Sequence, residues 1–161
     1  MAYASTYAGT YAPRLGSMMD GTPPVVWNCP IAASGTVKVG DFVIRTSGLV
    51  VACAAGGTLT LGIALEPAPT AAGNILILVA TGQTLFMLPI HHGTESSADI
   101  EAADMDMVKT YDLSVETLPY WFIDKEGSAG IGVKIHKFVD PLGTVNGLVL
   151  ASIDYDHREV K

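Results

Sequence analysis

The sequence predicts an all-β protein, a compact barrel or sandwich of short strands. Three observations support this fold class. Short apolar runs are rich in β-branched and aromatic residues, they are bounded by Gly, Asn, Thr and Pro, and they recur about every eight to twelve residues without helical segments between them. Of the 161 residues, 49% are hydrophobic and 16% are charged. The charged share is below the roughly 25% of ordinary soluble domains, so copies of the chain or a larger assembly are expected to cover surplus apolar surface.

Residues 1–30 are expected to form an extended N-terminal arm. Tyr3, Tyr7 and Tyr11 recur every four residues among small residues, and the prolines that follow favour extended backbone over a helix. The segment is either a disordered tail or an arm ordered by contact with another subunit. Its aromatic residues favour contact, because Tyr and Trp supply large amphipathic surfaces. The predicted contact residues are Tyr3, Tyr7, Tyr11, Arg14 and Trp27.

Residues 31–161 are predicted to form a single β domain. The expected strands lie within residues 36–45, 49–53, 59–65, 74–80, 85–90, 120–123, 131–139 and 148–155. The strand around residues 75–79 is apolar at every position, so both of its faces should be covered, one by the core and the other by a neighbouring subunit. The predicted oligomer interface is therefore Ile75, Leu76, Ile77, Leu78 and Val79.

Residues 91–119 interrupt the β pattern with a polar insertion, which is acidic over residues 91–110. Residues 97–107 are expected to form either a short helix, capped by Ser96 or Ser97, or a solvated loop. The carboxylates Asp99, Glu101, Asp104 and Asp106 lack the glycine and glutamate spacing of an EF-hand. A solvated acidic face is the favoured interpretation.

No catalytic or metal site is expected, and no cofactor. His91, His92 and Glu95, with His136 far downstream, superficially resemble the metal-binding set of a cupin barrel. Successive residues of a strand point to opposite faces, so His91 and His92 cannot both reach one metal ion from inside a barrel. Cys29 and Cys53 form neither a CxxC pair nor a disulfide framework. The nucleophile-elbow, Walker and GxGxxG motifs are not found in the sequence.

The charge balance disfavours two classes of partner. The formal net charge is −7 and the nine Lys and Arg residues are scattered, so direct nucleic-acid binding is not expected. The N-terminus lacks the basic and apolar regions of a signal peptide, and no run approaches the roughly 18 apolar residues of a membrane span, so neither secretion nor membrane anchoring is expected.

Three segments resemble the N-terminal half of head decoration proteins of tailed bacteriophages, which are also called capsid cement proteins. They are residues 39–43 (VGDFV), residues 62–65 (GIAL), and residues 80–83 (ATGQ) leading into residues 85–89 (LFMLP). The resemblance covers residues 36–90, and its motifs are short strands joined by glycine turns. It implies a compact, usually trimeric β domain that clamps neighbouring major capsid proteins on the outside of an icosahedral shell. The location implied is the exterior of the virion, after assembly in the host cytoplasm.

Two alternatives remain open. Another phage structural subunit, of the tail tube or baseplate, would also assemble β domains through arms, and it would form rings or hexamers in isolation. A ligand-binding barrel of the cupin kind would hold a metal ion. The composition and the residue pattern favour a structural protein, because the chain offers apolar area and an arm but no set of catalytic residues.

Overall fold

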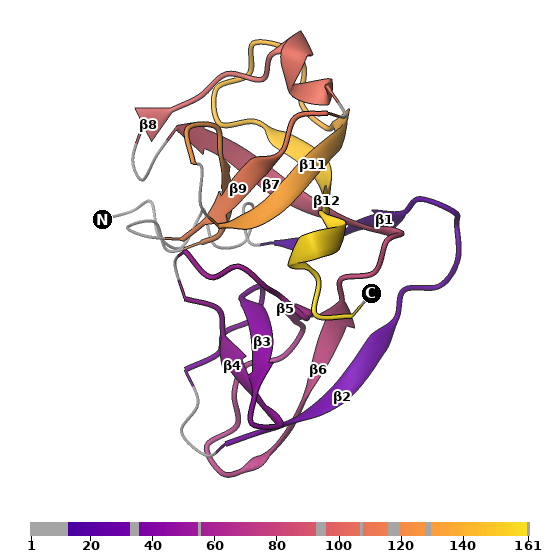
Figure 1. Cartoon of the computed structure of the whole chain (residues 1–161), viewed down its shortest axis with the longest axis vertical. Coiled ribbons are helices and arrows are strands. Elements are labelled where there is room, and N and C mark those ends of the chain that lie inside the picture. Colours follow the sequence, from indigo (N-terminus) through magenta and orange to yellow (C-terminus); the bar gives the residue numbers. More distant parts are fainter. Residues whose placement is uncertain are drawn as a thin grey trace.

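The computed structural model describes residues 13–32, 36–54, 56–92, 96–106, 108–115, 120–127 and 130–160. Within these residues the chain forms twelve strands and two short 3-10 helices, which confirms the all-β class. The strands build two closed sheets placed end to end along the longest axis of the molecule (Figure 1). The described residues contain no helix that is long and apolar enough to cross a membrane.

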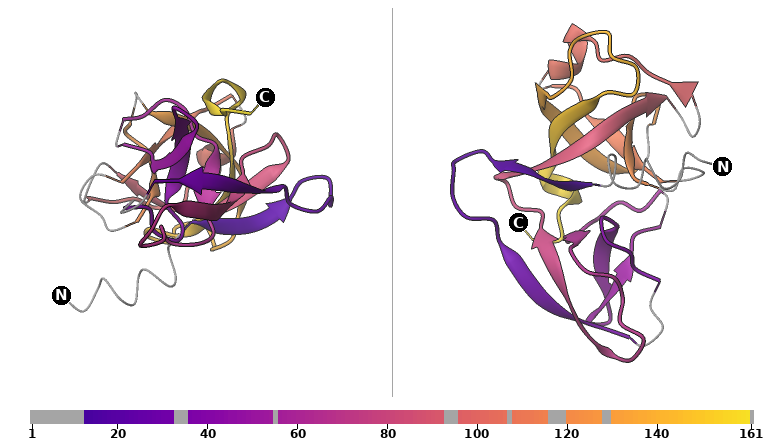
Figure 2. Two further views of the ribbon diagram at one scale, coloured as in Figure 1. Left: turned by 90° about the horizontal axis from the view of Figure 1, so that it is seen from below. Right: turned by 180° about the vertical axis from the view of Figure 1, so that it is seen from behind.

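The first barrel closes in the order β2-β4-β3-β5-β6. Its longest ladder joins β2 and β6, which run antiparallel from the pair Val26–Leu78 to the pair Ile31–Gly73. Both strands extend to the end of the molecule that is far from the second barrel (Figure 2). The bounds are β2 Val26–Ile31, β3 Phe42–Thr46, β4 Leu49–Ala52, β5 Gly62–Ala64 and β6 Gly73–Val79.

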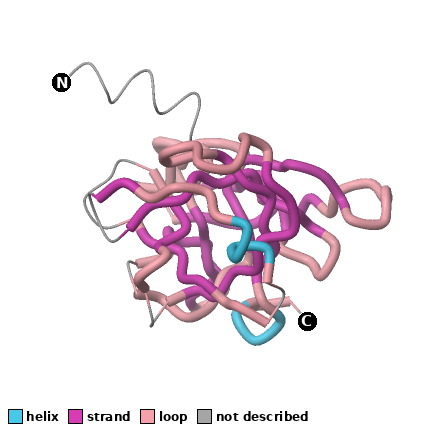
Figure 3. The backbone as a smooth tube through the Cα atoms, turned by 90° about the horizontal axis from the view of Figure 1, so that it is seen from above, coloured by secondary structure: helices cyan, strands magenta, loops and turns pink. Residues whose placement is uncertain are grey.

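The second barrel is built around β7, the longest strand. Its sheet runs β1-β7-β10-β9-β11-β12, and β12 pairs with β7 again, which closes it; β8 adds to one edge of β7. Seen from above, the described chain consists of strands and loops with two short helical turns (Figure 3). The bounds are β1 Arg14–Met18, β7 Thr84–His92, β8 Ser96–Ser97, β9 Tyr111–Ser114, β10 Phe122–Asp124, β11 Ile131–Phe138 and β12 Leu148–Ile153, with 3-10 helices η1 Ala102–Met105 and η2 Tyr155–His157.

One hydrophobic cluster joins the two barrels. The core of the second barrel includes Phe42, Ile63 and Leu78, which come from strands of the first. The ring of Phe42 makes edge-to-face contacts with Phe86 and Trp121, at centroid distances of 5.5 and 5.4 Å. Such contacts add to the stabilisation from burial, so the barrels are expected to behave as one rigid body.

The chain crosses between the barrels at three places. Residues 19–25 lead from β1 to β2, residues 80–83 lead from β6 to β7, and the C-terminal segment returns from η2 to the first barrel. There Thr60 donates its N–H to the carbonyl of His157 and accepts from the N–H of Glu159. The carboxylate of Glu159 pairs with Arg45 on β3, so this segment ties the two barrels together.

The structure corrects the boundary of the N-terminal arm. From Arg14 onwards the chain belongs to the fold: β1 pairs with β7 between Arg14–Met87 and Met18–Thr84, and β2 is part of the first barrel. The extended backbone that prolines favour is also the backbone of a strand, so the sequence pattern did not separate the two. Residues 1–12 lie outside the described residues.

The structure also corrects the insertion expected over residues 91–119. The proposed helix over residues 97–107 is reduced to a single 3-10 turn, Ala102–Met105, and residue 107 lies outside the described residues. Residues 111–114 form β9, which lies between β10 and β11 in the second barrel. Only four residues long, β9 was not recognised in the polar sequence that surrounds it.

Candidate interaction surfaces

Arg14 and Trp27, the two predicted contact residues of the arm that the structure describes, lie on different barrels. Arg14 lies on β1, and its guanidinium is 3.0 Å from the sulfur of Met87 in the second barrel. Trp27 lies on β2, where it packs against the core of the first barrel, with the guanidinium of Arg45 5.6 Å from the centre of its ring. Trp27 is thus partly engaged within the fold. Tyr3, Tyr7 and Tyr11 lie outside the described residues.

The predicted interface on β6 is mostly interior. Ile75, Ile77 and Val79 face the core of the first barrel, and Leu78 is buried in the cluster between the barrels. Only Leu76 is exposed. Within the single chain, the outer face of the run is covered at Leu78 by the other barrel and left exposed at Leu76. Cover by a neighbouring subunit is therefore not needed at Leu78, and at Leu76 it stays a prediction.

An exposed apolar surface lies on the outside of the first barrel, around Leu76. Leu65 donates its N–H to the carbonyl of Leu76, and on the other side Leu76 pairs with Asn28 of β2. Residues 37–40 run beside this row, since Gly40 donates to the carbonyl of Ala64. We define the outer wall as the exposed apolar residues Val26, Val39, Leu65 and Leu76.

Charge is divided unequally between the barrels. Residues 26–80, which contain the whole first barrel, hold four charged residues that sum to zero: Lys38, Asp41, Arg45 and Glu66. Residues 81–161 hold six basic and thirteen acidic residues, so they carry the entire net charge of −7. This asymmetry was readable in the sequence, and it points to the outer wall that the strand pattern alone did not reveal.

A buried ionic network fixes the loop that contains η1. The ammonium of Lys125 is 2.8 Å from Glu101 and 3.1 Å from Asp104, and it donates to the carbonyl of Asp99. Tyr111 donates its hydroxyl to Asp104 at 2.7 Å. The side chain of Asp104 is fully buried and that of Lys125 is 6% exposed.

Within this network the pKa values of Lys125 and Tyr111 are both raised, which keeps Lys125 charged and Tyr111 protonated. Burial opposes the charge of Lys125, but hydrogen bonds to Glu101 and Asp104 outweigh burial and raise the pKa of Lys125 above its ordinary value. Burial, together with the bond to Asp104, raises the pKa of Tyr111 far above that of a free phenol, so its hydroxyl remains a donor. The network is satisfied within the fold, which indicates a structural clamp.

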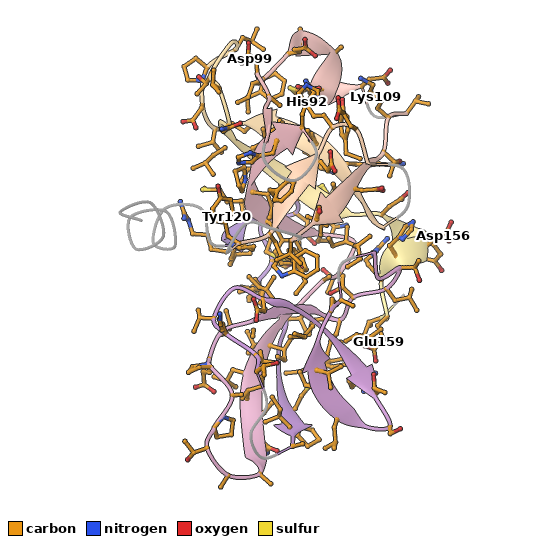
Figure 4. All side chains as sticks on the ribbon, turned by 90° about the vertical axis from the view of Figure 1, so that its left-hand side faces the viewer. His92, Asp99, Lys109, Tyr120, Asp156 and Glu159 are labelled. Carbon is orange, nitrogen blue, oxygen red and sulfur yellow. The ribbon has the colours of Figure 1, made fainter. Side chains whose placement is uncertain are left out.

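The histidines and carboxylates that the structure describes do not converge on one point. His91 is buried against the ring of Phe122, at a centroid distance of 5.1 Å, while the ring of His92 lies 3.6 Å from Glu126. Figure 4 shows His92, Asp99 and Lys109 toward the end of the second barrel that is remote from the first. In the described part of the chain no three His, Cys, Asp or Glu residues are grouped so as to hold a metal ion.

The two cysteines are buried thiols in different cores. Cys29 lies in the core of the first barrel and Cys53 in the cluster shared by both. Burial raises the pKa of Cys53 to about 12. A thiol in such surroundings is a poor nucleophile, because the thiolate is the reactive form.

His136 and Ser152 form the pair that most resembles reactive groups. The Nε2 atom of His136 is 2.8 Å from the hydroxyl of Ser152 across β11 and β12. Partial burial and then the charge of Lys134 lower the pKa of His136 below its ordinary 6.5. The hydrogen bond joins β11 to β12, so the pair links two neighbouring strands of the second barrel.

Replacing His136 with glutamine is expected to reduce the loss of stability in mild acid. In the wild type, the unfolded state binds a proton near pH 6.5 while the folded state resists it until a lower pH, so stability present above pH 6.5 is lost as the pH falls. Urea unfolding at pH 8.0 and pH 5.5 measures this difference. Equal losses of stability between pH 8.0 and pH 5.5 in the variant and the wild type would show that His136 does not contribute to the pH dependence of stability.

Comparisons of the chain with models of protein families, with curated protein sequences and with solved structures find no match. Inferences about its function therefore rest on its own residues and their arrangement.

Proposed function

We propose that the protein is a structural subunit of a tailed-phage virion, which binds as an oligomer, most simply a trimer, to the outside of the icosahedral capsid and stabilises it. The partners are the major capsid protein and other copies of this chain. The proposed role is not enzymatic and requires no cofactor.

The observation that carries the proposal is the pairing of two unlike barrels through one shared hydrophobic cluster. The first barrel is neutral and exposes apolar side chains, while the second barrel and C-terminal segment carry the net charge of −7. Their common cluster around Phe42 holds the two surfaces in a fixed relation. A decorating subunit needs this division, because it must pack densely at one end and remain solvated at the other.

The segments that resemble phage decoration proteins support the same reading. Residues 39–43 lead into β3, residues 62–65 contain β5, and residues 80–83 form the link to β7. Residues 85–89 lie in β7, so the resemblance falls on the first barrel, on its connection to the second and on the central strand of the second. It is a likeness of short strands and glycine turns, and its bearing on function is part of the proposal.

Co-sedimentation with shells purified without this protein tests the proposed function. The full chain should bind saturably, and decorated shells should resist heat or low salt better than bare ones. Absence of binding at micromolar concentration would contradict the proposal. Assembly of the isolated protein into rings or hexamers would favour the tail-tube or baseplate alternative.

Removing residues 1–12 is expected to weaken shell binding while leaving the fold intact. The truncation takes away Tyr3, Tyr7 and Tyr11 but keeps β1 on β7. Loss of one aromatic anchor often costs about 2 kcal/mol or more, so even if only one of the three tyrosines is an anchor the dissociation constant should rise by about thirtyfold. The measurement pairs shell co-sedimentation with thermal melting.

Removal of residues 1–25 provides the comparison. This longer truncation also deletes β1, so the domain should melt at a clearly lower temperature than the chain without residues 1–12. If the shorter truncation binds shells as tightly as the full chain does, then the three tyrosines are not contact residues.

A further inference from the structure

The outer wall is an apolar surface built on paired backbone. Its residues are substantially exposed: Val26 by 43%, Val39 by 57%, Leu65 by 39% and Leu76 by 36%. Val26 and Leu76 are held on the ladder between β2 and β6, and Leu65 is hydrogen-bonded to Leu76. A partner would therefore meet side chains whose backbone is already ordered, which lowers the entropic cost of association.

Val26 places the wall next to the junction of the barrels. It pairs with Leu78, whose own side chain is buried in the cluster shared by both barrels. Val26 thus lies beside the buried cluster, while its own side chain is exposed. Exposed apolar side chains on neighbouring strands of a barrel with few charges are typical of an interaction site.

The charges beside the wall are self-complementary. Lys38 precedes Val39 and Glu66 follows Leu65, and both charged residues are exposed. Segments 37–41 and 64–68 run side by side through backbone bonds, such as that from Ala68 to the carbonyl of Val37. One copy of the wall therefore presents a basic and an acidic group to any second copy.

The distribution of charge over the chain also indicates which partner covers the outer wall. Two second barrels would repel each other, because residues 81–161 carry a net charge of −7. Two first barrels would not, because residues 26–80 are neutral. Contact through the first barrel is the arrangement in which identical copies can approach with the least repulsion.

We infer that the outer wall is the contact surface between copies of this chain, with Lys38 of one copy facing Glu66 of the next. The inference deepens the proposed function by naming the partner of this surface, and it rests on that function only for the role of the resulting oligomer. Leu65 and Leu76 form the apolar centre of the contact.

The test compares native mass by light scattering and sedimentation for three proteins. The wild type should form an oligomer at micromolar concentration. The Leu65→Asn/Leu76→Asn variant should dissociate about a hundredfold more readily, as expected for the loss of two central apolar contacts. Leu142→Asn/Val145→Asn is the control: these residues are 58% and 54% exposed on the second barrel, and their loss should leave the mass unchanged.

Charge reversal tests the orientation of the contact. Lys38→Glu and Glu66→Lys should each weaken association a few-fold, because each brings like charges together. The Lys38→Glu/Glu66→Lys variant should recover the wild-type dissociation constant within about twofold. Glu66 also accepts a hydrogen bond from the N–H of Leu76, so recovery in the double variant, and not weakening in a single one, identifies the pair.

Each remaining outcome decides the matter. A wild type that stays monomeric, or a folded Leu65→Asn/Leu76→Asn variant of unchanged mass, overturns the inference, whether or not shells are bound. If that variant loses shell binding while the wild type is a monomer, the wall instead binds the shell. An oligomer that depends on Leu65 and Leu76 but binds no shell would support the inference and contradict the proposed function.

Discussion

Replacing Gly62 with alanine is expected to destabilise the protein by about 4 kcal/mol or more, which is exceptional for the addition of one methyl group. Gly62 begins β5, has a φ of +153°, and pairs with Val79 of β6. A β-carbon there would lie 1.9 Å from the carbonyl oxygen of Leu78 and 2.9 Å from its carbon. Since both atoms belong to backbone, β5 and β6 would have to separate at the side of the first barrel that faces the second.

Gly73 provides the matched control, because it lies on the same β6 ladder. A β-carbon at Gly73 would meet the ring of Pro69 at 3.5 Å, which is an ordinary van der Waals contact. Gly73→Ala should therefore change the free energy of unfolding by less than about 1 kcal/mol. Chemical denaturation of both variants measures the difference, and equal stabilities would show that the β5–β6 approach is looser than the structure indicates.

Replacing Lys125 with methionine is expected to cost about 3–5 kcal/mol. The substitution keeps most of the apolar stem but removes the cation that neutralises Asp104, whose side chain is fully buried. The uncompensated carboxylate would remain among Tyr111 and the backbone of η1. Equilibrium unfolding in urea gives the change in free energy.

Two comparisons separate this effect from the loss of any surface charge. Lys134 pairs with Asp154 at 3.8 Å with both side chains 30% exposed, so Lys134→Met should cost no more than about 1 kcal/mol. In addition, Asp104→Asn should cost less in the Lys125→Met background than in the wild type, because the two residues act as one unit. If the effects of Asp104→Asn and Lys125→Met on the free energy of unfolding were additive, the two side chains would not be coupled as a buried ion pair.

The sequence was sufficient for the fold class because alternation and glycine turns are local signals. Strands such as Ile131–Phe138 and Leu148–Ile153 were placed to within a few residues. The division into two barrels was not predicted, because it depends on contacts such as Phe42 with Trp121, which are far apart in the chain. The alternation of apolar residues along a strand predicts that a side chain is buried, but it does not predict which part of the structure buries it. Leu78 is an example, because the second barrel of the same chain covers it.

The N-terminal segment shows a second limit. Its small residues and prolines gave no strong strand pattern, yet Gly16 packs closely enough on Leu150 that a β-carbon would lie 2.2 Å from that side chain. Such a residue is selected by its tertiary neighbour and not by local propensity. For the candidate surface, the individual predicted contacts were less informative than the charge asymmetry between residues 26–80 and 81–161.

Electron cryo-microscopy of shells saturated with the full chain tests the central claim most directly. The account predicts added density on the outer surface of the shell, in which copies meet through first barrels around Leu65 and Leu76 and the acidic second barrels point to solvent. Shells that carry no added density at saturating protein, with the chain recovered free in solution, would contradict it.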